Sequence, residues 1–293
     1  MKKETKTRKP KAGLLLVASP RFKNLSGPKR GSYGEKKEAV SRQIVESLDF
    51  LDVEYPGIVY EREDAEKAMD LFYNSRVDFI IAEFLSWSED FAWIRFLRDC
   101  PQIPMIFVNV AKDRMAFETT LDEDDFIEYL CSGTLVGSLE ASGSVRRVPR
   151  KDVRLVMGTR DEVNEQIRVF SRAALARAVL RKSNVGLMAN MNEAMWSTYI
   201  DNYDLFTKIG PEIHYLPYSD YKEYIDALTD VEVKEYADTL TSRYRMMEDV
   251  EYDKFIGCVK ASLALKNMAR DNDVDVMVYN DIDRATFKVS GCR

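Results

Sequence analysis

The stretch that decides the fold is VGLMANMNEAMWSTYIDNYDLFTKIGPEIHYL, residues 185–216. It begins with an apolar run, 185–188, that predicts a buried strand, followed by a polar loop. A helical pattern then covers about 193–208 and is ended by Gly210-Pro211. A second strand begins at 214–216. Because this β-loop-α-β unit starts more than halfway along the chain, the sequence predicts a second α/β domain after a first one.

The residues before this stretch predict a parallel sheet of their own. Apolar runs, typical of strands covered on both faces, alternate with helical patterns. The predicted strands are Gly13–Ala18, Val53–Tyr60, Val77–Ala82, Pro104–Val110 and Val153–Met157. This alternation favours right-handed crossovers and an α/β, flavodoxin-like, doubly wound domain.

Helical patterns fill the segments between these strands. The first begins near Glu35, and Asp64 is the predicted N-cap of the second. The apolar stripe of the first is Val40, Ile44, Leu48 and Leu51. The stripe of the second is Ala65, Ala68, Met69 and Phe72. Shorter helices are predicted at Phe91–Arg98 and Asp122–Leu130.

Three further helices and a strand complete the expected organisation. Asp161–Lys182 predicts a long helix, Asp230 and Asp253 cap two more, and Val274–Tyr279 is a strand. The long helix carries arginines at 168, 172, 177 and 181, which form either a solvated face or a subunit or inter-domain contact. We therefore expect two tandem Rossmann-like, flavodoxin-like domains. The predicted boundaries are a basic tail at 1–12, an N-terminal domain at 13–160 and a central domain at 161–293.

Composition and charge bound the class of protein. The chain has 293 residues, 45% hydrophobic and 31% charged, which suits two globular domains. Its net charge of −6 argues against nucleic acid as the main partner. No apolar run approaches the ~18 residues of a membrane span, and 13–18 is too short for an export signal. The widely separated Cys100, Cys131, Cys258 and Cys292 predict reduced thiols in a cytoplasmic protein.

Ligands in open α/β sheets bind beyond the carboxyl ends of the strands, so four loops are candidate sites. These loops are 19–34, 83–89, 189–192 and 280–283. None contains a dinucleotide-binding or P-loop pattern. The acidic pair Asp281 and Asp283 could hold a divalent metal with a substrate phosphate, or cap a turn or helix.

His214 is the only histidine in the chain. Any Ser-His-Asp, Cys-His or His-ligated metal site would have to use it. Its place at the start of a predicted strand favours a structural role, so nucleophilic catalysis is not expected. Paired carboxylates remain candidates for acid–base chemistry, although no spacing singles out one pair.

Two stretches resemble the L-arabinose/L-fucose isomerases. One is NVGLMANMNEAMWST from Asn184. The other is DVEVKEYADTLTSRYRM from Asp230, with the later ending ALKNMARDNDVDVMVYNDID. The likeness covers nearly the whole chain as an order of elements, with these two local stretches and no signature motif.

The resemblance implies a cytoplasmic aldose–ketose isomerase with N-terminal and central Rossmann-like domains and a C-terminal β-rich domain. It implies trimers or hexamers with the active site between neighbours. In the family, Mn²⁺ held by two acidic residues and a histidine polarises the sugar oxygens while carboxylates move a proton through an enediol. Tyr-Leu-Cys-Ser-Gly at 129–133 lacks the histidine that arabinose isomerases carry there. We expect the metal ligands and the catalytic residues to lie beyond Arg293. This chain would then contain neither, so it would bind no ion and be inactive alone.

What the resemblance maps onto this chain is the wall of a sugar cleft. The implied substrate-binding residues are Ser19, Arg21, Asn190, Met191, Asn192, Asn280 and Asp281. Amide side chains both donate and accept hydrogen bonds, which suits sugar hydroxyls. The expected reaction, once a C-terminal domain completes the site, is isomerisation of a pentose or deoxyhexose. The alternatives are a cytoplasmic sugar- or polyol-binding regulatory subunit and a structural partner in a mixed oligomer.

Overall fold

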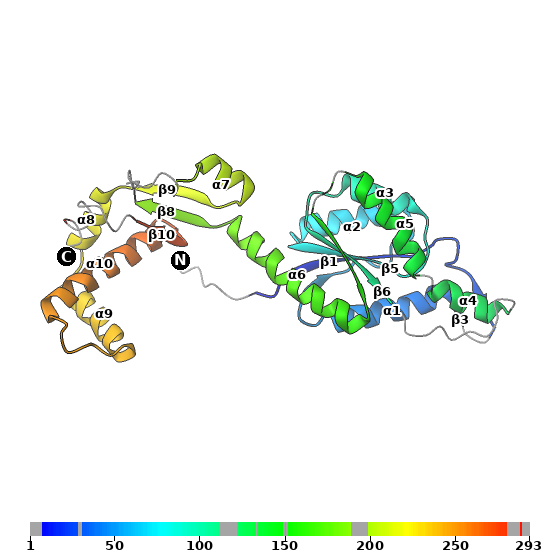
Figure 1. The fold of residues 1–293 in the computed structure, drawn as a ribbon, viewed down its shortest axis with the longest axis horizontal. Coiled ribbons are helices and arrows are strands. Elements are labelled where there is room, and N and C mark those ends of the chain that lie inside the picture. The colour runs from blue at the N-terminus through cyan, green and yellow to red at the C-terminus, as the bar shows by residue number, and fades with distance from the viewer. Residues whose placement is uncertain are drawn as a thin grey trace. The chain divides into compact units, whose positions relative to one another are not determined.

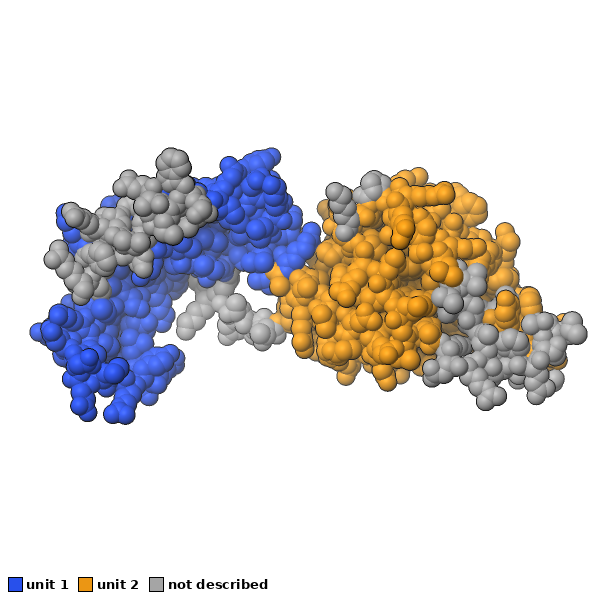
Figure 2. Space-filling view, in the orientation of Figure 1, with its two compact units in different colours: residues 1–4, 177–293 blue, residues 5–176 orange. Residues whose placement is uncertain are grey.

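A computed structural model of the chain describes residues 8–28, 31–111, 122–132, 134–148, 150, 152–188, 199–279 and 288. The chain divides into two compact units, residues 5–176 and residues 177–293 with 1–4, coloured separately in Figure 2. The division falls inside the helix α6 (Arg160–Leu180), because Val163, Ile167 and Ala174 of that helix pack into the core of the first unit.

The first unit is built on a parallel sheet whose described strands lie in the order β4-β1-β5-β6-β7. Their bounds are Lys11–Val17 (β1), Asp52–Glu54 (β4), Phe79–Phe84 (β5), Met105–Val110 (β6) and Val153–Gly158 (β7). Taken in chain order, these strands have the 2-1-3-4-5 arrangement of flavodoxin-like sheets. The predicted doubly wound α/β fold is therefore confirmed. A short antiparallel pair, β2 (Ser26–Gly27) and β3 (Gly31–Ser32), lies in the loop after β1.

Helices cover both faces of this sheet, as the near-continuous apolar strands require. Figure 1 shows α2, α3 and α5 on one side and α1 and α6 on the other. Their bounds are Tyr33–Ser47 (α1), Arg62–Asn74 (α2), Asp90–Asp99 (α3), Glu123–Ser132 (α4) and Thr134–Arg147 (α5). Strand β1 supplies both cores, because Leu14 and Leu16 point to one face while Leu15 and Val17 point to the other.

Helix α1 differs from its predicted form at two points. It begins at Tyr33 rather than near Glu35, because the side chain of Ser32 accepts a hydrogen bond from the Glu35 N–H and caps it. Val40 is 36% exposed, so its place in the apolar stripe was wrong. The inward face instead passes through Lys37, which is 2% exposed and donates its ammonium to the carbonyl of Leu85. A lysine with a buried partner therefore replaces the expected valine.

Two other predictions in the first unit were corrected. Asp64 is not the N-cap of α2; it lies in the first turn, and its carboxylate accepts the N–H groups of Tyr60 and Glu61. The predicted strand 53–60 is regular only at Asp52–Glu54, because beyond it the chain touches β1 by a single bridge at Val59. Helix α5 was not predicted; its residues read as weakly patterned, with two glycines among fourteen positions.

The second unit is a smaller parallel sheet in the order β10-β8-β9. Its strands are Asn184–Met188 (β8), Glu212–Leu216 (β9) and Val276–Val278 (β10). Its helices are Asn202–Lys208 (α7), Tyr218–Asp226 (α8), Asp230–Arg243 (α9) and Tyr252–Asp271 (α10). Met188, Leu216 and Met268 belong to the core that this sheet forms with α8 and α10. The predicted second parallel α/β sheet is thus confirmed, whereas α8 was not predicted.

Helix boundaries in this unit follow local capping. The pattern predicted from 193 is not helical at 199–201, because Asp201 caps α7 by accepting the N–H of Asp204; residues 193–198 lie outside the described part. Gly210 has φ 126°, which favours glycine and stops the helix as predicted. Thr229 rather than Asp230 caps α9, in a capping box with Glu232. Glu251 rather than Asp253 is the N-cap of α10.

No helix in the described ranges combines the length and the apolar character needed to cross a lipid bilayer.

The four arginines predicted on the long helix differ in their surroundings. Arg168 lies over the ring of Phe50, with its guanidinium carbon 3.9 Å from the centroid, whereas Arg172, Arg177 and Arg181 are exposed.

The two cysteines whose side chains are described should differ in reactivity. Cys100 is 5% exposed, and burial raises the pKa of its thiol, whereas Cys258 is exposed. Because the thiolate is the reactive form, we expect brief iodoacetamide treatment of the folded protein to modify Cys258 and spare Cys100. Peptide mass spectrometry before and after denaturation measures this. Equal labelling of both in the folded protein would contradict the buried position.

Candidate functional site

The strand order places a switch point between β1 and β5. The chain leaves β1 toward one edge of the sheet and leaves β5 toward the other, so the loops that follow them separate and open a crevice. Residues 18–21 follow β1 and residues 85–89 follow β5. This carboxyl edge is where the fold directs a ligand.

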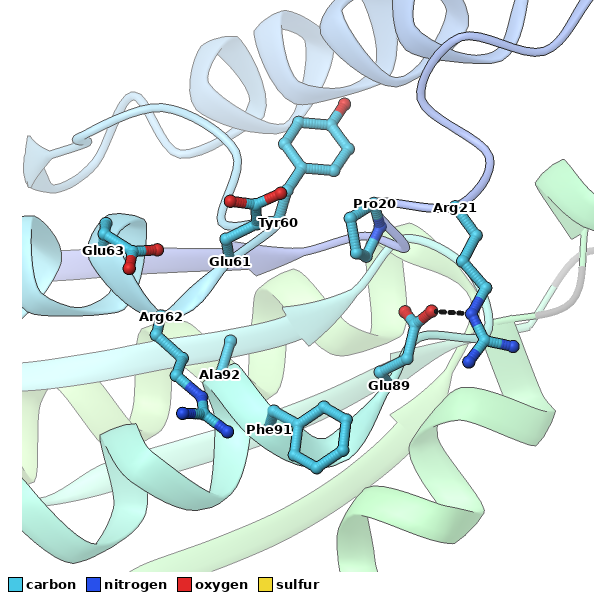
Figure 3. Close-up of a pocket in the computed structure, with 9 residues that line it drawn as sticks. All are labelled: Pro20, Arg21, Tyr60, Glu61, Arg62, Glu63, Glu89, Phe91 and Ala92. Carbon is cyan, nitrogen blue, oxygen red and sulfur yellow. Dashed lines mark ion pairs between the residues drawn. The ribbon is translucent and has the colours of Figure 1, made fainter.

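Glu89 ties these two loops together. Its carboxylate accepts a hydrogen bond from the Ser19 hydroxyl at 3.0 Å and pairs with Nε of Arg21 at 2.7 Å, the ion pair drawn in Figure 3. Ser19 is fully buried, and the Glu89 side chain is 13% exposed. Arg21 remains 69% exposed, and its guanidinium carbon lies 5.9 Å from the centroid of the Trp87 ring. The charged end of Arg21 is thus oriented by Glu89 while it faces solvent.

A hollow of about 530 Å³ lies beside this ion pair. Its walls come from the loop after β1, the first turn of α2 and the first turn of α3 (Figure 3). The lining residues are Pro20, Arg21, Tyr60, Glu61, Arg62, Glu63, Glu89, Phe91 and Ala92. Charged groups of both signs therefore share the hollow with two aromatic rings and a proline ring.

Each of the two aromatic residues that line the hollow makes a cation–π contact. The guanidinium carbon of Arg62 lies 5.4 Å from the centroid of the Phe91 ring, and the Lys23 ammonium lies 4.6 Å from that of Tyr60. Phe91 is 64% exposed although it lies in the first turn of α3, a helix that packs in the core. Burial, followed by the neighbouring acidic groups, raises the pKa of Tyr60, so its phenol stays protonated at neutral pH.

A second hollow, of about 750 Å³, shares Arg21, Glu89 and Phe91 with the first. It extends along α3 toward α5. Its other lining residues are Trp87, Ser88, Asp90, Ile94, Glu140, Gly143, Ser144, Arg147 and Val148. The Arg21–Glu89 pair therefore belongs to the walls of both spaces.

Buried polar pairs hold the same edge of the sheet rigid. Glu83, 3% exposed at the end of β5, receives both terminal nitrogens of Arg160 at 2.6 and 3.0 Å. The amide of Asn109 donates to the hydroxyl of Ser138 at 2.7 Å. Both carboxylate oxygens of Glu83 are engaged by this arginine, so Glu83 positions α6 rather than facing the hollow.

The structure brings together two of the predicted substrate-binding residues. Ser19 and Arg21 meet on the Glu89 carboxylate. The others lie outside the described residues: Asn190, Met191, Asn192, Asn280 and Asp281, with Asp283 of the acidic pair. His214 lies in β9 of the second unit, with Nε2 3.8 Å from the Glu212 carboxylate.

Sequence reasoning placed Glu89 in a candidate loop but did not single it out, and it missed Tyr60, Arg62 and Phe91. No motif marks these residues. The available signal was positional: each lies within two residues of the start of a helix that follows a strand. That position alone does not distinguish a lining residue from an ordinary surface residue.

The described residues do not fit the Mn²⁺ that the resemblance implies. Nowhere among them do three Asp, Glu, His or Cys side chains come together so that they could hold a metal ion.

The geometry suits recognition by hydrogen bonds and ring contact. Carboxylates and guanidiniums make charge-assisted hydrogen bonds, and aromatic faces cover apolar parts of a ligand. No protein-family model matches the chain, and no curated protein matches it either.

Proposed function

We propose that the first unit binds a small, neutral, polyhydroxylated molecule, a sugar or polyol, in the hollow at the carboxyl ends of β1 and β5. The supporting observation is its lining: three carboxylates and two guanidiniums together with the faces of Tyr60 and Phe91. Paired oxygens and forked N–H groups match vicinal hydroxyls, which both donate and accept. A volume of about 530 Å³ is in the range of small-molecule sites.

The balance of charge argues against an anionic ligand such as a nucleotide. Carboxylates outnumber guanidiniums in the lining, and Arg21 is already paired with Glu89. A phosphate would have to displace that carboxylate and approach Glu61 and Glu63 as well. A neutral polyol can instead accept hydrogen bonds from the arginine and donate them to the carboxylates without breaking the pair.

The resemblance to the L-arabinose/L-fucose isomerases supports a pentose or deoxyhexose as the ligand. In this proposal the chain supplies the wall of the sugar cleft of an aldose–ketose isomerase in a cytoplasmic homo-oligomer, a trimer or hexamer. The Mn²⁺ ligands then come from outside the described residues. The alternative is a sugar-binding or regulatory protein without catalysis; it is favoured by the hollow, whose walls all come from one unit.

Titration calorimetry with pentoses, deoxyhexoses and their polyols, with and without Mn²⁺, tests the proposal. Glu89→Gln keeps the shape but removes the charge that holds Ser19 and Arg21, so we expect the affinity to fall about tenfold or more. Phe91→Ala should weaken binding several-fold through lost ring contact. Tyr73→Ala is the matched control, because Tyr73 is 66% exposed on α2 and lines neither hollow.

The outcomes separate the two candidate functions. Tight metal-independent binding without ketose formation favours the binding protein, and Mn²⁺-dependent formation of a ketose favours the isomerase. Absence of binding for every sugar and polyol, or binding that Glu89→Gln and Phe91→Ala both leave unchanged, overturns the assignment of the hollow.

A further inference from the structure

Strand β7 is the outermost described strand of the first sheet. It pairs with β6 along Val153–Gly158, and no described strand pairs with its other side. Alternate N–H and C=O groups of a parallel edge strand point outward, so β7 presents a row of backbone groups to which no described strand is paired. Its sequence, VRLVMG, contains no proline and one charged residue, Arg154. The usual features that protect an edge are therefore sparse.

One face of β7 is buried and the other is exposed. Val156 is 8% exposed and belongs to the core under α6. On the opposite face, Leu155 is 48% and Met157 is 64% exposed. They lie beside Phe107 and Asn109 of β6 in the sheet register. Strand β7 thus combines outward backbone groups, to which no described strand is paired, with an exposed row of apolar side chains.

Helix α5 explains why this face is open. It packs on β5 and β6, and Ser138 of α5 bonds to Asn109 of β6. The next residue, Leu139, is 64% exposed. The apolar surface of the sheet therefore continues past the last helix on this side, over the outer half of β7.

We propose that β7 pairs antiparallel with β7 of a second copy of this chain across a twofold axis, joining two sheets into one. Residues opposite each other in an antiparallel pair point to the same face. With Leu155 opposite its own copy, Val153 lies opposite Met157, and the apolar residues of both strands form one row. Arg154 then lies opposite Val156, which keeps the two guanidiniums from facing each other directly.

Pairing of this edge with a second copy gives a closed dimer and not an open-ended filament. The pairing is isologous, so it uses the outer edge of each β7 once and closes as a dimer. Six residues per copy bury less than the ~800 Å² per partner of a stable interface. The contact is therefore weak, with a dissociation constant on the order of 1–100 μM. Inside a larger homo-oligomer it would act as one of several contacts.

Analytical ultracentrifugation of the full chain across this concentration range tests the pairing. Leu155→Lys puts two ammonium groups opposite each other, and we expect the association to weaken at least tenfold. Val169→Lys is the matched control, since Val169 is 54% exposed on α6 and should leave association unchanged. Met157→Lys is the second variant, for use if Leu155→Lys alters the circular dichroism spectrum.

Cysteine cross-linking tests the register directly. In a background with Cys131, Cys258 and Cys292 replaced by serine, Leu155→Cys should form a disulfide dimer under mild oxidation, because opposite Cα atoms lie within the range that a disulfide spans. Arg154→Cys should not, because in this register its two copies lie about 8 Å apart. The proposal is overturned by a monomer at all concentrations, by association that both lysine variants leave intact, or by equal cross-linking at the two positions.

Discussion

Replacing Arg150 with methionine should lower the free energy of unfolding by about 3–5 kcal/mol. The Arg150 side chain is 3% exposed and pairs with Asp152 at 2.9 Å. It also donates to the carbonyls of Cys100, Pro101 and Ile103. Methionine keeps much of the aliphatic volume but leaves the Asp152 carboxylate, which is 19% exposed, and three carbonyls without these donors, so each loses a charge-assisted hydrogen bond.

Urea unfolding followed by tryptophan fluorescence measures this loss, because Trp93 is buried in the core of the first unit. Arg98→Met is the control: the Arg98 side chain is 65% exposed and pairs with Asp99 at 2.6 Å. Its removal should cost less than about 1 kcal/mol. If Arg150→Met and Arg98→Met lower the free energy of unfolding equally, the buried Arg150 guanidinium does not stabilise the contact between the turn after α3 and the start of β7.

The second large effect is expected at the ion pair between Arg160 and Glu83. Arg160→Met should also cost about 3–5 kcal/mol, because it leaves the Glu83 carboxyl group without its counter-ion in a site that is 3% exposed. The double variant Glu83→Gln/Arg160→Met removes that unpaired carboxyl group and should regain a large part of the stability. The two substitutions are therefore expected to be strongly non-additive.

A double-mutant cycle on Glu83→Gln, Arg160→Met and the double variant measures the coupling by urea unfolding. The pair links the end of β5 to the first residue of α6, so the same variants should loosen the carboxyl edge where the hollow lies. Additive effects within about 0.5 kcal/mol would contradict a direct interaction. Sugar affinity measured on the folded variants then separates loss of stability from loss of the site.

The elements that sequence predicted well share one property, a strong local pattern. The run at 13–18 and the stripe Ala65, Ala68 and Phe72 are buried as expected. The errors occur where two local interpretations were equally good. Lys37 and Val40 both lie at helical spacing from Ile44, and only the packing of α1 on the loop after β5 selects the lysine as the inward residue. Periodicity counts apolar positions and cannot detect a polar group that finds a buried acceptor.

The candidate site was predictable only in part. The loop after β1 was identified from the fold rule, and Ser19 and Arg21 lie in it. Their meeting point, Glu89, is 70 residues from Ser19 in the chain. Nothing in the spacing of acidic residues distinguishes it from its neighbours. Phe91 reads as one more apolar residue of a helix, and only the packing of α3 leaves it exposed beside Arg62.

By itself the sequence determined the type and approximate position of most strands and helices, the parallel arrangement of both sheets and several helix ends. These properties depend on backbone sterics, side-chain period and capping bonds among residues a few positions apart. The tertiary structure alone decided which charged groups pair, as Arg8 with Asp78 and Arg160 with Glu83 do. It also decided which strand is left at the edge. The two pairs join residues 70 and 77 positions apart, which meet only when the whole sheet has assembled.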